Sequence, residues 1–289
     1  TKFDIIVVGN VGQLTKIISG YTLSVMIYHG MGLKQSYYTD IDEIIDIRSV
    51  ESEARYNELK DQGHKNIVLT GFTKLDPLFS DDDQEKNNTK EELGIKNDLP
   101  ILLYAPTFYP TSFDNLASEL QFISSEFNVI IKLHNFSWFQ SRYSYQSDLA
   151  KSISLQSENV YLLDNSIYNI IPYYKISDIL ISDISSTIFE YLALDRPIIQ
   201  AECFKLRMRH RVFKKRFWKK LDIARMQEID FVYKVSSPSE LFRNVTFASD
   251  YPQEMSGLRL EAYDYFLYKR DGNASGRLID EIEKKISLT

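Results

Sequence analysis

The chain has 289 residues, of which 44% are hydrophobic and 26% are charged, and its formal net charge is −6. This composition is ordinary for a globular protein and is sufficient for one large or two smaller hydrophobic cores. The single cysteine, Cys203, excludes a disulfide framework and a cysteine-rich zinc site. No apolar run approaches the ~20 residues that a membrane-spanning helix needs, so we expect a cytoplasmic protein.

One segment carries a charge opposite to that of the whole chain. Residues 205–220, which we call the basic segment, hold nine Lys or Arg residues and no acid. Phe213, Phe217 and Trp218 lie among these cations, which favours contact with an anionic membrane surface. The alternative interpretation is the solvated face of a helix.

Apolar, β-branched runs alternate with longer stretches of helical pattern along the chain. Several of the apolar runs are continuous, which is typical of strands buried on both faces, and the alternation predicts parallel sheets in an α/β fold. We expect strands at residues 4–8, 23–28, 44–46, 66–69, 101–105, 129–133, 160–162, 179–181 and 197–200. We expect helices at residues 49–62, 113–126, 144–155, 169–175 and 186–194.

Residues 80–88 interrupt this alternation, because they are polar, charged and free of large apolar side chains. We interpret them as a linker between domains. A boundary at this point divides the chain into an N-terminal domain, residues 1–85, and a C-terminal domain, residues 86–289.

Two further helices are predicted after the linker. Thr89 to Gly94 has the pattern of a short capped helix, with Thr89 as the N-cap, Glu92 at the capping-box position and Gly94 as the stop. A turn is predicted at residues 271–276, and an amphipathic helix that overlaps its end is predicted at residues 274–286. This last helix is a candidate to pack back on the N-terminal domain.

The first motif with chemical content is Tyr28-His-Gly-Met-Gly-Leu-Lys34, at the end of a predicted strand. Glycines let the backbone turn sharply and approach a ligand, and ligands bind at the carboxyl ends of strands in open α/β sheets. Histidine is the usual general base near neutral pH, which makes His29 a candidate catalytic residue. The alternative is a structural histidine at the end of a strand.

Two later strands also end on polar residues. Leu103-Tyr-Ala-Pro-Thr-Phe108 places the hydroxyl of Thr107 where it can bind a phosphate, although Pro106 also suffices to end a strand. Ile130-Ile-Lys-Leu-His134 ends on a histidine that can donate to a pyrophosphate. Because one strand ends in a histidine in each of the two expected domains, we favour a ligand site over two unrelated structural residues.

The richest motif is the turn and helix start Ser182-Asp-Ile-Ser-Ser-Thr-Ile-Phe-Glu190. Free N–H groups and a partial positive charge at a helix N-terminus attract anions, and hydroxyl side chains complete such a site. Simple N-capping is the alternative, but one serine is enough for a cap. We expect the turn to bind phosphates, and Glu190 to accept bonds from ribose hydroxyls. The candidate donor-binding residues of this turn are Ser182, Asp183, Ser185, Ser186, Thr187 and Glu190.

Several common motifs are absent from the sequence. It has no phosphate-binding loop ending in Gly-Lys-Ser/Thr, no complete GxGxxG, no HExxH and no DxD sugar-nucleotide motif. Nothing in it requires a metal or a cofactor, and we expect no nucleic-acid partner.

Taken together, the motifs resemble those of the CDP-glycerol glycerophosphotransferase family, the teichoic-acid primases and polymerases. Tyr28–Lys34 is similar to the family's Trp-His-Gly-Thr-Pro-Leu-Lys, and Val68-Leu-Thr-Gly-Phe-Thr-Lys-Leu-Asp76 to its Thr-Gly-x-Pro-Arg-x-Asp. Ile130–His134 resembles the family's strand ending Lys-x-His-Pro, and Ser182–Phe189 resembles its Thr-Asp-Tyr-Ser-Ser-x-x-Phe-Asp.

The resemblance implies a GT-B fold, in which two Rossmann-like domains with parallel sheets face a central cleft. It places the acceptor on the N-terminal domain and the nucleotide donor on the C-terminal domain. It also implies transfer of a phospho-alditol, such as glycerol phosphate, from a CDP-linked donor to a hydroxyl of a cell-surface polymer or lipid-linked acceptor, with release of CMP.

The resemblance assigns roles to individual residues as well. His29 takes the proton of the acceptor hydroxyl, and His134 with Ser185, Ser186 and Thr187 stabilises the pyrophosphate and the leaving CMP. The basic segment then holds the enzyme at the inner face of the cell membrane. The N-terminal domain is short for this fold, so either one or two strands precede Thr1 or this member is minimal.

The sequence departs from the family pattern at several positions. Gly32 and Asn135 replace prolines, while Lys74 and Tyr109 replace arginines. We therefore expect acceptor or phosphate contacts from other residues, and the candidates are Gly30, Lys34, Lys132 and Arg207.

Two other functions remain open from the sequence. The first is a GT-B glycosyltransferase that uses a nucleotide-sugar donor with the same histidine and serine geometry. The second is a non-catalytic Rossmann binding module.

Overall fold

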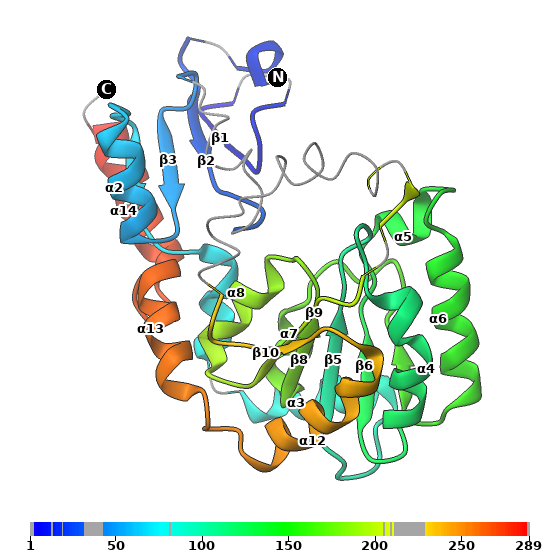
Figure 1. Cartoon of the computed structure of the whole chain (residues 1–289). Coiled ribbons are helices and arrows are strands. Elements are labelled where there is room, and N and C mark those ends of the chain that lie inside the picture. The colour runs from blue at the N-terminus through cyan, green and yellow to red at the C-terminus, as the bar shows by residue number, and fades with distance from the viewer. Residues whose placement is uncertain are drawn as a thin grey trace.

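The computed structural model describes residues 3–12, 14–18, 20–31, 43–80, 82–204, 206–208, 210 and 229–287. Its strands form two sheets, one of four strands and one of six, and every strand pair is parallel (Figure 1). The expected α/β architecture with parallel sheets is therefore confirmed. The four-stranded sheet contains β1 (Ile5–Val8), β2 (Leu23–Met26), β3 (Ile47–Val50) and β4 (Ile67–Leu69), in that order.

The six-stranded sheet has the order β10-β9-β8-β5-β6-β7. Its strands are β5 (Ile101–Ala105), β6 (Asn128–Ile131), β7 (Val160–Leu162), β8 (Ile179–Ser182), β9 (Ile198–Ala201) and β10 (Tyr233–Val235). The chain runs outward from β5 through β6 to β7, then crosses back to β8 and runs outward on the other side. The order reverses between β5 and β8, and such a switch point is where open α/β sheets bind ligands.

Helices connect the strands and cover the sheets. The α-helices are α2 (Glu53–Asp61), α3 (Asp83–Leu93), α4 (Phe113–Ile123), α5 (Phe136–Phe139), α6 (Tyr145–Gln156), α7 (Ile171–Ile176), α8 (Thr187–Tyr191), α12 (Leu241–Asp250), α13 (Ser256–Phe266) and α14 (Ala274–Ser287). Short 3-10 helices are η1 (Leu14–Lys16), η2 (Thr73–Phe79), η3 (Leu192–Leu194) and η4 (Pro238–Glu240).

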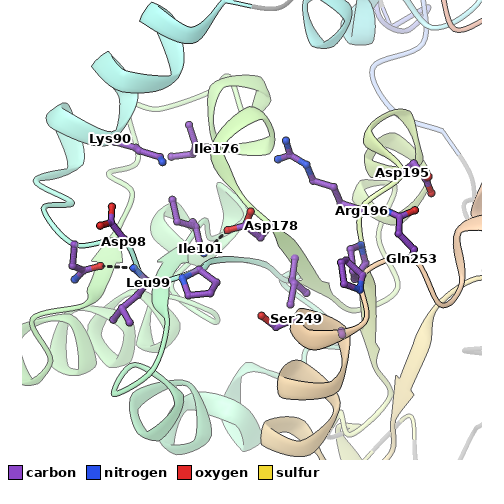
Figure 2. A pocket seen from close by; sticks show the side chains of 16 residues that line it. Lys90, Asp98, Leu99, Ile101, Ile176, Asp178, Asp195, Arg196, Ser249 and Gln253 are labelled. Atoms are coloured by element: carbon purple, nitrogen blue, oxygen red, sulfur yellow. Dashed lines mark hydrogen bonds between the residues drawn. The ribbon is translucent and has the colours of Figure 1, made fainter.

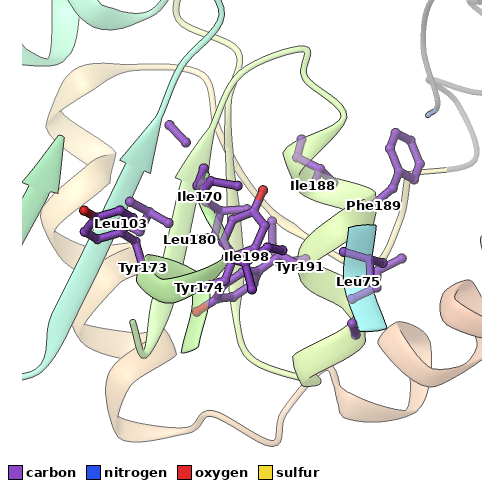
Figure 3. Close-up of a cluster of buried hydrophobic side chains, with 14 of the residues drawn as sticks. Leu75, Leu103, Ile170, Tyr173, Tyr174, Leu180, Ile188, Phe189, Tyr191 and Ile198 are labelled. Atoms are coloured by element: carbon purple, nitrogen blue, oxygen red, sulfur yellow. The ribbon is translucent and has the colours of Figure 1, made fainter. Parts of the chain in front are cut away.

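Neighbouring residues in the central strands point to opposite faces of the six-stranded sheet. Leu102 and Tyr104 of β5 lie in the core beneath α4, α6 and α12, whereas Leu103 and Ala105 lie in the core beneath α7, α8 and α13. All residues of β5, β6, β8 and β9 are buried, as the continuous apolar runs predicted. Leu75 of η2 reaches the second of these cores and lies next to α8 (Figure 3).

Helices α2 and α14 cover the four-stranded sheet (Figure 1). Leu59 of α2 packs with Met26 and Val50, while Leu278 of α14 packs with Val25 and Ile47. The last helix of the chain therefore covers the first sheet, so the two ends of the sequence meet there.

The predicted boundaries near β3 are wrong by a few residues. The strand expected at 44–46 is Ile47–Val50, and the helix expected from residue 49 begins at Glu53. The reason is local: residues 47–50 are buried and pair with β2 and β4, and Ser52 then caps the helix by accepting a bond from the Arg55 N–H at 3.2 Å.

The predicted linker at residues 80–88 is also wrong as a description of structure, because α3 begins at Asp83. Asp82 is the N-cap and accepts from the Glu85 N–H at 3.0 Å, while Thr89, the expected cap, lies inside the helix. Gly94 ends the helix in the left-handed conformation, as predicted. β10 and α12 were not predicted. The division into two domains at residues 85 and 86 remains a proposal.

Asp76 ties the segment after β4 to the start of α14. Its carboxylate accepts the backbone N–H groups of Ala274 at 2.9 Å and Ser275 at 2.7 Å. Gly71 has a positive φ of 94°, and a Cβ there would lie 3.1 Å from the carbonyl oxygen of Tyr268. The Thr-Gly…Asp segment therefore has a structural role, since it joins parts of the chain far apart in sequence.

We expect Asp76→Ala to lower the free energy of unfolding by about 0.5–2 kcal/mol, because two N–H groups at the start of α14 lose their acceptor. Urea unfolding followed by circular dichroism measures this. The matched control is Asp280→Ala on the exposed face of α14, which should change stability by less than about 0.5 kcal/mol. Equal effects of the two substitutions would contradict the capping role.

Candidate active site

The candidate site lies at the carboxyl ends of β5 and β8, where the strand order reverses. Ala105 and Ser182 are paired in register as the last residues of these two strands. The loop that carries Thr107 and the turn that carries Ser185 therefore leave the sheet side by side. β6 flanks β5 on the other side, which brings His134 to the same edge of the sheet.

Asp183 is completely buried and holds the loop after β5. Its carboxylate accepts the backbone N–H of Ser112 at 3.2 Å and also the Ser112 hydroxyl. Burial raises the pKa of the Asp183 carboxyl to about 7, against the opposing effect of these hydrogen bonds. We therefore place Asp183 behind the site, as the residue that fixes the loop, and not among the groups that contact a donor.

The hydroxyl groups of the turn differ in whether their protons are already used. The Ser182 hydroxyl donates to the Ala105 carbonyl at 2.7 Å, so the Thr187 hydroxyl, 2.8 Å from it, must be the donor in that pair. The Ser186 hydroxyl donates to Glu190 at 3.1 Å. Among the residues that the structure describes, the Ser185 hydroxyl only accepts, from the Thr187 N–H at 3.4 Å, and its proton remains available to a ligand oxygen.

Thr107 is the second available hydroxyl. Its backbone bonds to Asp183, but its side-chain hydroxyl has no hydrogen-bond partner within the described part of the chain. Thr107 and Ser185 thus present hydroxyl donors from the two loops that flank the switch point.

Glu190 is 1% exposed, and protein groups occupy both of its carboxylate oxygens. Oε2 lies 2.7 Å from the Lys74 ammonium and accepts from the Tyr174 hydroxyl at 3.1 Å, while Oε1 accepts from Ser186. The sequence suggested a bond to ribose, but this geometry instead makes Glu190 an anchor between η2, α7 and α8. The sequence identified Lys74 only as a replacement for an arginine and did not predict its ion pair with Glu190. Its position in the Val68–Asp76 motif was the one sequence signal that pointed to a role at the site.

Lys132 and Lys74 form a local excess of positive charge. Burial, together with the neighbouring charge of Lys74, lowers the pKa of Lys132. The Lys132 ammonium donates to the Leu133 carbonyl at 3.3 Å and has no ion-pair partner among the residues described. A bound anion would relieve this repulsion, and Lys132 was one of the cations expected from the sequence.

The two predicted catalytic histidines are held in opposite tautomers. His29 Nδ1 lies 3.0 Å from the Gly9 carbonyl oxygen, which can only accept, so Nδ1 carries the proton and Nε2 has the lone pair. His134 Nδ1 accepts from the Phe136 N–H at 3.1 Å, so the proton of the neutral ring is on Nε2. His29 is thus prepared to take a proton, and His134 to donate a hydrogen bond.

The remaining candidates from the sequence are Gly30, Arg207, Lys34 and the rest of the basic segment. Gly30 is buried next to His29. Arg207 lies behind the loop after β5, stacked on Tyr109 and Tyr143. Lys34 and residues 211–220 of the basic segment lie outside the described residues.

A cavity of about 540 Å³ lies at the opposite end of the six-stranded sheet (Figure 2). Its charged groups already serve the fold: Asp178 accepts the Ile101 N–H at 2.8 Å, Asp195 pairs with Arg259, and Arg196 donates to carbonyls at the end of α7. We therefore do not place the chemistry there.

The described ranges hold neither a candidate metal site nor a candidate membrane span. They contain no group of three or more His, Cys, Asp or Glu side chains arranged to hold a metal ion. They also contain no helix with the length and apolar character needed to cross a bilayer.

Comparison with known proteins identifies the family. Residues 47–284 match the profile of the CDP-glycerol:poly(glycerophosphate) glycerophosphotransferases. The chain is 30% identical over 151 residues to a teichoic acid poly(glycerol phosphate) polymerase of Bacillus spizizenii, covering 48% of this chain and 35% of the relative. It is 27% identical over 242 residues to the polymerase of the same description from Bacillus subtilis, covering 77% of this chain and 29% of the relative. The chain thus spans about a third of the length of these curated relatives.

Solved structures support the same fold. The wall teichoic acid polymerase TagF matches with a TM-score of 0.71 at 17% identity, over 99% of this chain and 73% of that one. A UDP-GlcNAc 2-epimerase from Neisseria meningitidis matches with a TM-score of 0.54 at 14% identity, over 97% of this chain and 76% of that one. These likenesses concern the fold alone, and the match to TagF confirms the expected GT-B type. With a profile match over most of its length, the chain belongs to the CDP-glycerol:poly(glycerophosphate) glycerophosphotransferase family.

Proposed function

We propose that this protein transfers an alditol phosphate, such as glycerol phosphate, from a CDP-linked donor to a hydroxyl of a polymer or lipid-linked acceptor. Membership of the family and the names of its relatives support this class of reaction. The observation that carries the proposal is the pair of opposite histidine tautomers, because transfer needs one group that accepts a proton and another that donates to phosphate.

In this reaction, the acceptor hydroxyl oxygen attacks the phosphorus that bears the alditol. The bond between that phosphorus and the bridging oxygen breaks, and the electron pair leaves with CMP. The proton of the acceptor hydroxyl passes to Nε2 of His29. No redox partner is needed, and the work of the protein is positioning and charge stabilisation.

Four groups at the carboxyl edge of the six-stranded sheet suit the donor pyrophosphate. They are the ammonium of Lys132, Nε2–H of His134 and the hydroxyls of Thr107 and Ser185. In our proposal they bind the phosphate oxygens and stabilise the negative charge that gathers on the leaving CMP. Ser182, Asp183, Ser186, Thr187 and Glu190 hold these groups in place from behind.

We propose, further, that the enzyme acts in the cytoplasm at the inner face of the cell membrane, held there by the basic segment. The support is its nine cations and interspersed aromatic residues.

The donor is tested by incubating the protein with CDP-glycerol, CDP-ribitol or nucleotide sugars, together with a glycerol phosphate oligomer as acceptor. We expect CMP release and growth of the oligomer with a CDP-alditol only. Release of UDP or GDP from a sugar donor, with no CMP from any CDP-alditol, would establish the glycosyltransferase alternative instead.

Histidine variants serve as the controls of that assay. His29→Gln should lower the rate by about 10²–10⁴-fold, because an amide cannot act as a base. His134→Gln should retain more activity than His134→Ala, since the amide keeps an N–H donor. His64→Gln, far from the site in sequence and structure, should match the wild type. A wild-type rate in His29→Gln would reject His29 as the base, whereas no transfer by the wild type with any donor would support a non-catalytic module.

Ser185→Ala and Ser186→Ala should separate the available hydroxyl from the one that is already used. We expect Ser185→Ala to weaken transition-state stabilisation by about 1–3 kcal/mol, seen as a lower kcat/KM for the CDP donor, with only a small fall in melting temperature because the bond that Ser185 accepts is long, at 3.4 Å. Ser186→Ala should mainly lower the melting temperature, because Glu190 loses a donor. The reverse pattern would reject the assignment.

Neutralising Lys214, Lys215 and Arg216 to Gln should weaken pelleting with vesicles that contain anionic lipid, and more so at low salt. Neutral vesicles are the control. Unchanged pelleting at low salt would reject the membrane contact.

A further inference from the structure

A second cavity, of about 360 Å³, lies behind the loop that carries Thr107. We call it the tyrosine pocket, because Tyr109, Tyr143 and Tyr145 line it together with Arg142 and Arg207. Its size is within the range of ligand sites, about 300–1,000 Å³. Neither the mechanism proposed above nor the packing of the core uses this cavity.

The tyrosine pocket adjoins the donor site through a single layer of aromatic side chains. The ring of Phe108 lies 4.7 Å from the ring of His134 and 5.1 Å from that of Tyr143. The Gln146 amide fixes this loop by donating to the Phe108 carbonyl at 3.1 Å. A ligand in the pocket would thus lie beside the site of transfer without occupying it.

Arg207 is held firmly in the wall of the pocket. Its guanidinium carbon lies 4.1 Å from the ring centroid of Tyr109 and 4.8 Å from that of Tyr143. Its backbone N–H donates to the Tyr109 hydroxyl at 3.1 Å, and that hydroxyl lies 2.7 Å from His210 Nδ1. Because a stacked guanidinium keeps N–H groups at its edge for other partners, this arrangement prepares Arg207 to bind an anion.

The charge balance in the pocket also favours an anion. Its lining holds two arginines, Arg142 and Arg207, and one acid, Asp114. The Asp114 carboxylate already accepts the Tyr145 hydroxyl at 3.0 Å. Neither arginine forms an ion pair within the described ranges.

We propose that the tyrosine pocket binds a phosphodiester of the acceptor chain, one or more units behind the hydroxyl that reacts. The inference rests on the proposed function and adds an acceptor subsite to it. A poly(alditol phosphate) chain matches the lining, because arginines bind its phosphates while tyrosine rings and hydroxyls contact its polyol. The subsite favours acceptors of several units over a single glycerol phosphate.

The test uses the full chain, with a glycerol phosphate oligomer of several units and single glycerol phosphate as probes in isothermal titration calorimetry. We expect Arg207→Gln and Arg142→Gln each to weaken oligomer binding by about tenfold, because each removes a charge-assisted hydrogen bond. Affinity for CDP-glycerol should not change. Arg142 is exposed, so its variant should keep the fold even if Arg207→Gln does not, as melting temperatures will show.

Arg243→Gln, an exposed arginine on α12 outside the pocket, is the matched control and should bind the oligomer like the wild type. The inference is overturned if the oligomer binds no better than single glycerol phosphate, or if both pocket variants match this control. It is also overturned if they lose binding only to anionic vesicles, which would make the pocket a lipid contact. Oligomer binding through these arginines without CMP release from any CDP donor would reject the proposed transferase and leave the pocket as an anion site.

Discussion

The position of β5 in the middle of the six-stranded sheet is the constraint on which the candidate site depends. The chain leaves β5 on one side towards β6 and β7 and returns on the other side to β8. The loops that follow β5 and β8 leave the carboxyl edge side by side, where Ala105 and Ser182 are paired, and the chain then continues to β6 on one side and to β9 on the other. The space above a reversal of this kind is open to a ligand, because no connection crosses it. Thr107, Ser185 and His134 all reach this edge for that single topological reason.

Hydrogen bonds within the protein decide which groups at this edge remain available, and two buried carboxylates accept several of these bonds. Asp183 binds the loop after β5, and Glu190 joins η2 to α8 through Lys74 and Ser186. A buried carboxylate needs several donors to offset its loss of water, so each one takes up protons that a phosphate could otherwise receive. Of the four hydroxyls in the turn, those of Ser182, Thr187 and Ser186 already donate to protein groups. The Ser185 hydroxyl is therefore the one that can donate to a ligand. The same carboxylates make the site rigid, which suits a reaction that depends on positioning.

The structure shows which contacts are made by Lys74 and Tyr109, two residues that depart from the family pattern. Lys74, in place of an arginine, keeps a positive charge near the site while it pairs with Glu190 and faces Lys132. Tyr109, also in place of an arginine, supports the guanidinium of Arg207, which comes from a distant part of the sequence. Where the family pattern has an arginine in the loop after β5, this chain has Tyr109, and the nearby positive charge is that of Arg207 in the lining of the tyrosine pocket.

The sequence by itself determined the α/β class and most of the strands, and it proposed the two histidines as site residues, because continuous apolar runs and strand-end motifs are local patterns. It also indicated the family, since several weak motifs in a fixed order are specific together. Local patterns misplaced the start of α2 and mistook the first turns of α3 for a linker, because a polar helix and a polar loop have the same composition. Only the tertiary structure decided that Glu190 is an anchor, that Asp76 caps α14 and that Arg207 lies on Tyr109. These contacts join residues about 100 or more positions apart, and whether a polar group is free or already bonded depends on such partners.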